Sequence, residues 1–445
     1  MVRLPARQQE LWRLAWPLIL ANCTVPLLGM VDTAVVGHLP EPHHIGAVAL
    51  GATTFATLYL VFASVRMGTT GLTAQAVGAE AGEEARACLV RPLLLALVAG
   101  ALLIALGGPI VAAALHLFQP SDAVAAEFRV YVGWRLLSAP AALATFVVLG
   151  WLLGNQDTRS QFVLLVAANA LNAVLDVLFV FGFGWGVAGV AIATAIAEYA
   201  GLGLGLALAW RRWRRLPGGF DVAVLLAAAP FRRMFRVNGD LVVRTLFLEA
   251  VFLGFAAMSA RQGEVLLAAN AVLLNMILLQ AYALDGFAFA AEAMVGRAVG
   301  RRSPRELDEA FRAGAFWSVG FAVLIALAFA AGGGLLIALL TGIEAVRAAA
   351  GSFLVYVVAA PLLGAWAYLF DGVFSGATQT RELRNGSILA TAVFFAAAFP
   401  LAALLANHGL WLALIAFLAV RGLWLGWRYR LLTASDRFVL HPRTA

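Results

Sequence analysis

The sequence predicts an all-α integral membrane protein with twelve transmembrane helices in two pseudo-symmetric six-helix lobes. The chain of 445 residues is 63% hydrophobic and 12% charged, with a mean hydropathy of +0.90. A soluble protein of this size could not bury so many apolar side chains. Apolar stretches of about 20 residues, the length that crosses a bilayer, follow one another from Leu11 to about Leu432. The two halves of the chain also repeat each other.

The repeat has an offset of 222 residues at most matched positions, as from Gly150 to Gly372, with 221 between Pro140 and Pro361 and 223 between Gly186 and Gly409. The clearest matches are Gly150 with Gly372, Gly154 with Gly376, Thr158 with Thr380, and Arg159 with Arg381. Membrane proteins built from two related halves usually act at the seam between them, which favours a transporter. We interpret the two Gly-x-x-x-Gly segments as points of close helix packing.

The apolar stretches give the order of the spans. We expect spans to begin near residues 13, 45, 90, 124, 161, 187, 237, 264, 312, 348, 385 and 408. The first span contains Asp32 and no small-residue cleavage site, so we expect a retained helix and not a signal peptide.

The basic residues orient the chain. All 31 are arginines, and with the N-terminus inside, only Arg129, Arg261 and Arg347 fall in outer loops. This distribution follows the positive-inside rule and predicts a multi-pass membrane protein with both termini cytoplasmic. The net charge of +7 then reflects topology and contact with anionic membrane lipid, and nucleic acid is excluded as a partner.

The only sizeable linker lies between the repeats. We expect an N-terminal six-helix lobe at 1–212, a basic inter-lobe linker at 213–236 and a C-terminal six-helix lobe at 237–445. Six spans per repeat is an even number, so both lobes enter the membrane in the same direction. A cleft between two such lobes can open alternately to either side.

Polar residues inside spans cost free energy and are therefore candidates for function. At about 1.5 Å per residue, five of them in the first lobe lie at a similar depth, roughly 8–15 Å below the outer surface. They are Asp32, Asp176, Asn172, Thr194 and Tyr131. Their common depth predicts one shared polar pocket, which we expect to carry cation or proton coupling.

The two aspartates would repel each other in such a pocket, so we expect the pair either to take up a proton or to ligate a monovalent cation. A structural alternative stays open, in which the aspartates cap a kinked helix or pair with Arg135. Pro17 and Pro26 break the hydrogen-bond ladder of the first span and are its expected bending points.

Weaker candidates lie elsewhere in the spans. Glu198 could extend a proton path inward or be a paired structural carboxylate. Asp285 and Asp371 lie near inner span ends, where we expect water to reach them. Glu249 could form a second cation site, with Arg244 as an alternative partner.

Other patterns carry no site. We interpret the cluster of His38, His43 and His44 as a solvated outer loop, and we expect no metal and no cofactor. Cys23 and Cys88 are too separate for a disulfide framework. The glycine pattern at 184–189 follows a membrane helix instead of a strand, so we reject it as a dinucleotide site.

Several stretches resemble the multidrug and toxic-compound extrusion (MATE) family, in particular the branch named for DNA-damage-inducible protein F (DinF). They are residues 24–38 (TVPLLGMVDTAVVGH), 69–76 (TTGLTAQA), 149–154 (LGWLLG), 172–176 (NAVLD), 282–287 (YALDGF) and 410–414 (LWLAL). The resemblance covers essentially the whole chain. It implies two six-helix lobes around a V-shaped cleft that exports drug-like molecules against inward cation flow.

The resemblance also implies roles for particular residues. The family's coupling aspartates match Asp32 and Asp176, and the polar positions around them match Tyr131, Asn172 and Thr194. The proline that bends the first helix matches Pro17. A second branch binds sodium in the C-terminal lobe, where Glu249 and Asp371 could stand in for its carboxylates, and this mapping stays open.

We therefore expect a secondary active transporter and not an enzyme, acting as a cation-coupled multidrug efflux antiporter for small amphipathic compounds by alternating access. We favour H⁺ over Na⁺ as the coupling ion and expect a monomer. A lipid-linked oligosaccharide flippase of the wider superfamily is the alternative, although such a cleft should be rich in basic residues. A prenyl transferase would need paired Asp-rich motifs, and no span carries them.

Overall fold

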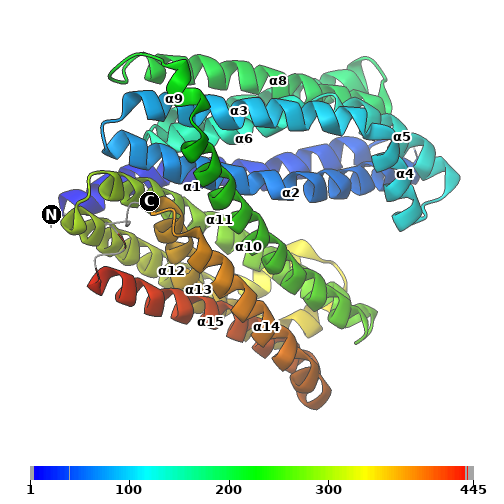
Figure 1. Ribbon diagram of the computed structural model, residues 1–445. Helices are drawn as coiled ribbons and strands as arrows, with labels where there is room; N and C mark the ends of the chain where they lie inside the picture. Colours follow the sequence, from blue (N-terminus) through cyan, green and yellow to red (C-terminus); the bar gives the residue numbers. More distant parts are fainter. Residues whose placement is uncertain (1–4, 40, 436–437, 439–445) are drawn as a thin grey trace. The chain divides into compact units, whose positions relative to one another are not determined.

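The computed structural model of the protein describes residues 5–39, 41–435 and 438, and for positions 25–28, 30, 33 and 42 it describes the backbone alone. Almost all of these residues are helical (Figure 1). The elements are α1 (Ala6–Gly37), α2 (Pro42–Gly78), α3 (Gly82–Ala105), α4 (Gly107–Phe118), α5 (Asp122–Leu136), α6 (Ala139–Gly154), α7 (Thr158–Val177), the π-helix η1 (Leu178–Gly182), α8 (Gly186–Trp213), α9 (Val222–Leu226), α10 (Ala228–Ala260), α11 (Glu264–Gly300), α12 (Pro304–Leu340), α13 (Glu344–Gly376), α14 (Thr380–Leu405) and α15 (Asn407–Ala434).

These helices confirm the predicted class of fold. Within the described residues, 10 helices are long and apolar enough to cross a membrane, and the bent pair α5 and α6 makes an eleventh candidate. Helix α1 occupies the position of the first predicted span. Every predicted span start falls inside one of these helices or helix pairs, so the twelve-helix plan agrees with the structure.

The internal repeat extends to the helix boundaries. An offset of 222 residues separates the first residues of α1 and α10, α2 and α11, α3 and α12, α5 and α13, and α7 and α14. The copies differ in continuity. The first copy is interrupted between α3 and α4 and bends by 50° between α5 and α6, whereas α12 and α13 run without a break.

The chain forms two compact units. The N-terminal unit is Leu20–Arg232, and the C-terminal unit combines Met1–Ile19 with Arg233–Ala445. The first part of α1 therefore belongs with the second half of the sequence, whereas the predicted lobe of residues 1–212 places it with the first half.

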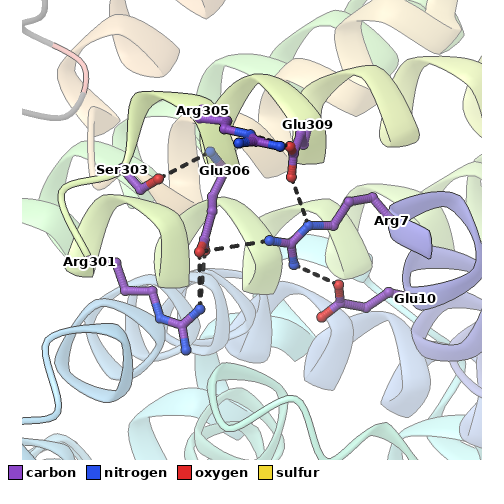
Figure 2. A network of polar contacts seen from close by, with 7 residues as sticks. All are labelled: Arg7, Glu10, Arg301, Ser303, Arg305, Glu306 and Glu309. Atoms are coloured by element: carbon purple, nitrogen blue, oxygen red, sulfur yellow. Dashed lines mark hydrogen bonds and ion pairs between the residues drawn. The ribbon is translucent and has the colours of Figure 1, made fainter. Parts of the chain in front are cut away.

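Polar contacts within the C-terminal unit explain where the start of α1 belongs. Figure 2 shows Arg7 of α1 beside three carboxylates. Its Nη1 donates to Glu10 at 2.8 Å and its Nε donates to Glu309 of α12 at 3.0 Å, with Glu306 at 3.7 Å. The indole of Trp317 also donates to the Gln8 carbonyl at 3.0 Å.

Glycines in α6 allow its backbone to approach that of α2, and this helix pair has the most extensive contact in the N-terminal unit. A Cβ atom at Gly150 would lie 2.4 Å from the carbonyl oxygen of Arg66, and one at Gly154 would lie 2.7 Å from that of Thr70. Real side chains cannot be accommodated at such distances from backbone, so both positions require glycine.

The C-terminal unit repeats this contact between α13 and α11, again its most extensive helix pair. A Cβ at Gly372 would lie 2.0 Å from the oxygen of Ala288, and one at Gly376 would lie 2.2 Å from that of Glu292. The partner carbonyls follow the same 222-residue offset as the glycines. The interpretation of these segments as close packing points is therefore confirmed.

We expect Gly372→Ala to destabilise the protein, because the added methyl forces α13 away from α11 at a cost of about 1–3 kcal/mol. The matched control is Gly320→Ala, where a Cβ meets nothing within 4 Å. That change should be neutral or stabilising by about 0.5–1 kcal/mol, because alanine favours a helix over glycine. Thermal unfolding of detergent-solubilised protein, followed by tryptophan fluorescence, compares the two. Equal melting temperatures would contradict the packing argument.

Candidate functional site

The N-terminal unit brings Asp32 of α1 and Asp176 of α7 together. Asp176 is fully buried and Asp32 is half-buried. Their carboxyl groups lie within hydrogen-bonding range of each other, with the Arg135 guanidinium close enough to act on both through its charge. Within the described residues, both Asp176 oxygens and Asp32 Oδ1 lack a donor. Because ionised carboxylates only accept hydrogen bonds, the pair forms one only when a proton lies between them.

Arg135 of α5 is held by Glu198 of α8. Arg135 Nη1 donates to Glu198 Oε1 at 2.8 Å, and the guanidinium lies 4.8 Å from the ring centroid of Phe55. Glu198 therefore has the paired arrangement, the second of the two alternatives that the sequence left open. The remaining oxygen, Oε2, is buried without a partner among the described residues.

Asn172 and Thr194 join α7 to α8 beside the carboxyl pair. Asn172 Nδ2 donates to Thr194 Oγ1 at 3.3 Å, and Thr194 Oγ1 donates to the Val190 carbonyl at 2.9 Å. One turn earlier in α7, Asn169 Nδ2 donates to Thr24 Oγ1 of α1 at 2.8 Å. Asn169, Asn172 and Asp176 are spaced by three and four residues, so they form one polar stripe along α7.

Tyr131 completes the predicted group of five. It is 4% exposed and lies near enough to Asp32 and Asp176 to experience their charges. Its ring occupies the space beside Gly51 of α2, where a Cβ would lie 2.4 Å from Tyr131 Cε1. The structure thus brings all five predicted residues into one region of the N-terminal unit, with Arg135 at its edge.

Three neighbours escaped the sequence analysis. Tyr59 has a buried hydroxyl with no partner among the described residues and experiences the charges of Arg135 and Glu198. Phe55 supports the guanidinium, and Gly51 makes room for the Tyr131 ring. The spacing of Phe55 and Tyr59 at i and i+4 on a predicted span was the available signal, but it is equally typical of an ordinary apolar helix face.

In the C-terminal unit, Asp371 of α13 is neutralised by two arginines. Arg421 Nη2 donates to Asp371 Oδ2 at 2.6 Å, and Arg244 donates to the same oxygen. The expectation that water reaches Asp371 is wrong, because the residue is only 6% exposed. Arg244 therefore pairs with Asp371 and not with Glu249. Glu249 is half-buried on α10, and Asp285 is half-buried on α11.

The prolines of α1 do not interrupt it. The helix is continuous from Ala6 to Gly37, although neither proline has an amide hydrogen to donate to the helix ladder. Pro17 is buried in the C-terminal unit, and the side chain of Pro26 lies outside the described part of the chain. Bending at these positions stays a prediction.

Repeated halves of membrane-spanning helices with ionisable groups buried inside the spans define a multi-pass membrane transporter. The MatE family model matches residues 17–178 and 241–401. DNA damage-inducible protein F of Escherichia coli is 45% identical over 433 residues, which cover 96% of this chain and 94% of that protein. The chain belongs to the MatE family, whose members are ion-coupled secondary transporters without a cofactor and not enzymes.

More distant similarities point to the same family. Multidrug resistance protein PmpM of Pseudomonas aeruginosa is 29% identical over 185 residues, covering 41% of this chain and 38% of that protein. The fold matches crystal structures of a MATE protein in the bent conformation (TM-score 0.86, 20% identity) and in the straight conformation (TM-score 0.87, 20% identity), each over 97% of both chains.

We expect Asp371→Asn to lower stability strongly, because it leaves the buried Arg421 guanidinium and the partly buried Arg244 guanidinium without a counter-charge, at a cost of about 3–5 kcal/mol. Asp308→Asn is the control, since Asp308 forms an exposed ion pair with Arg312 at 2.9 Å and exposed pairs contribute about 0–1 kcal/mol. The melting temperatures of the two purified variants test this difference. A similar small shift for both would show that Asp371 has no structural role.

Proposed function

We propose that the protein is a cation-coupled multidrug exporter that expels small amphipathic organic compounds by alternating access. Its membership of the MatE family and its relationship to proteins named for multidrug resistance support this proposal. In this proposal the protein acts as a monomer in contact with membrane lipid, in the bacterial inner membrane with both termini cytoplasmic. The arginine distribution supports that orientation.

The contact between Asp32 and Asp176 is the observation on which the coupling proposal rests. Two ionised carboxylates at hydrogen-bonding range repel each other, and Asp176 has no donor among the described residues to offset its burial. A proton shared between the two groups removes the repulsion and forms the hydrogen bond. We favour H⁺ over Na⁺ for this reason.

Transport would follow if substrate and proton exclude each other from the same site. In the charged state, the aspartates and the polar stripe of α7 form a wet site that tolerates a cationic or neutral substrate. Protonation from outside removes the charge, and α1 then shifts against α7 so that the substrate is released. Proteins of the same fold have been solved in bent and straight conformations, which supports a movement of this kind.

The energy available is sufficient for export. Each proton that moves inward down a membrane potential contributes about 2.3 kcal/mol per 100 mV, which supports a roughly fifty-fold substrate gradient. One proton per cycle would therefore sustain efflux of a neutral compound.

We expect Asp32→Asn to reduce efflux of a fluorescent organic cation at least tenfold, because the amide cannot cycle between charged and neutral forms. The control is Asp122→Asn, since Asp122 is exposed at the start of α5 in the same unit. Efflux is measured in cells with matched membrane expression of both variants. Full efflux by Asp32→Asn would remove that residue from the mechanism.

The coupling ion can be assigned in proteoliposomes with separately imposed gradients. We expect a pH gradient alone to drive uptake of a fluorescent cation, a sodium gradient alone to drive little, and Asp32→Asn to respond to neither. Drive by sodium alone would replace the proton in the proposal. Translocation of a lipid-linked oligosaccharide without drug transport would instead favour the flippase.

A further inference from the structure

Two histidines and a glutamate, separate from the Asp32–Asp176 pair, lie close together at one end of the N-terminal unit. They are His43 and His44 of α2 and Glu127 of α5, and one ligand atom from each lies within 4.8 Å of the others. The interpretation of His43 and His44 as part of a solvated loop is wrong. Both lie in the first turn of α2, with side chains only 24% and 17% exposed.

Packing between the helices produces this convergence. Val124 of α5 contacts α2 at Gly46, where a Cβ would lie 3.5 Å from Val124 Cγ2. Glu127 is one turn beyond Val124, which places its Oε1 3.9 Å from His44 Nδ1. The imidazoles of His43 and His44 have ring centroids 4.3 Å apart. Side chains from two different helices therefore face one point.

Two further features of the histidines suit them to act as metal ligands. His44 Nδ1 is buried and lacks a hydrogen-bond partner among the described residues. His43 Nδ1 lies 3.1 Å from Glu41 Oε2. A carboxylate on one imidazole nitrogen fixes the tautomer and leaves the other nitrogen with a lone pair for a metal, which is the common outer-sphere arrangement of metal-binding histidines.

We propose that His43, His44 and Glu127 bind a divalent transition-metal ion of the Zn²⁺ class, which clamps α2 to α5. Two imidazoles and one carboxylate form a familiar three-ligand zinc set with one position left for water. Imidazole favours zinc over Mg²⁺ and Ca²⁺, which prefer all-oxygen sites. Ligand atoms around tetrahedral zinc lie about 3.3 Å apart. Side-chain rotations that move the ligand atoms by about one to two ångströms would bring them to this spacing.

The proposed metal ligand Glu127 lies on the same helix, α5, as Tyr131 and Arg135. These residues follow Glu127 at intervals of four along α5, so all three share a face. An ion held by Glu127 restrains this helix where it contacts α2. The proposal concerns binding alone and does not depend on the transport function.

The test is metal titration of the full-length protein, purified in detergent without a polyhistidine tag. We expect calorimetry to give one equivalent of Zn²⁺ bound at micromolar or lower Kd, with Mg²⁺ and Ca²⁺ at least a hundredfold weaker. Co²⁺ should give the visible absorption bands of a tetrahedral site. Saturating Zn²⁺ should also raise the melting temperature, because it binds the folded state.

Substitutions assign the ligands. His43→Ala, His44→Ala and Glu127→Gln should each weaken Zn²⁺ binding at least tenfold, whereas His38→Ala should not, because His38 Nδ1 lies 2.7 Å from the Ala34 carbonyl, outside this cluster. His44→Gln serves if His44→Ala does not fold. Millimolar binding to the parent protein, tighter binding of Mg²⁺ or Ca²⁺, or unchanged Zn²⁺ affinity in the ligand variants would overturn the proposal.

Discussion

Close approach of two helix backbones is the constraint on which both units are built. In each unit the most extensive helix contact is the one where glycines of α6 or α13 lie directly on carbonyl oxygens of α2 or α11. Lipid offers little hydrophobic drive for helix association, so van der Waals contact between well-fitted backbones must provide it. The same contact at the same offset in both copies shows which feature the duplication had to preserve.

The α2–α6 contact also organises the polar region of the N-terminal unit. With α6 fixed on α2, the 50° bend before it sets the direction of α5 and therefore the positions of Tyr131 and Arg135. Phe55 and Gly51 on α2 then meet these residues. Within the described residues the C-terminal copy has no such bend, and there a single carboxylate, Asp371, pairs with both Arg244 and Arg421.

The sequence predicted the class of fold, the span order and the repeat, because these depend on composition and periodicity, which are local properties. It also placed Asp32 and Asp176 at one depth, since depth follows from counting residues along a span. It could not decide which charges pair, because partners come from different helices. The sequence offers Arg244 only as an alternative partner for Glu249, five residues away, whereas its observed partner Asp371 lies 127 residues further along the chain. Likewise Glu198 and Arg135 are distant in sequence and adjacent only after α5 packs on α8.

The π-helix η1, which begins two residues after Asp176, has a geometric consequence. A π-turn holds one residue more than an α-turn, which changes the angular register of the helix by about 100° between the segments on either side. The polar face of α7, with Asn169, Asn172 and Asp176, and the side chain of Phe179 therefore point in directions that a regular α-helix would not give. Phe179 packs on Gly189, and its ring centroid lies 4.9 Å from that of Trp185. In the second copy, the residue equivalent to Leu178 is Pro400, inside α14. Both copies therefore depart from regular helix geometry at this point, one by an inserted residue and the other by a missing amide hydrogen.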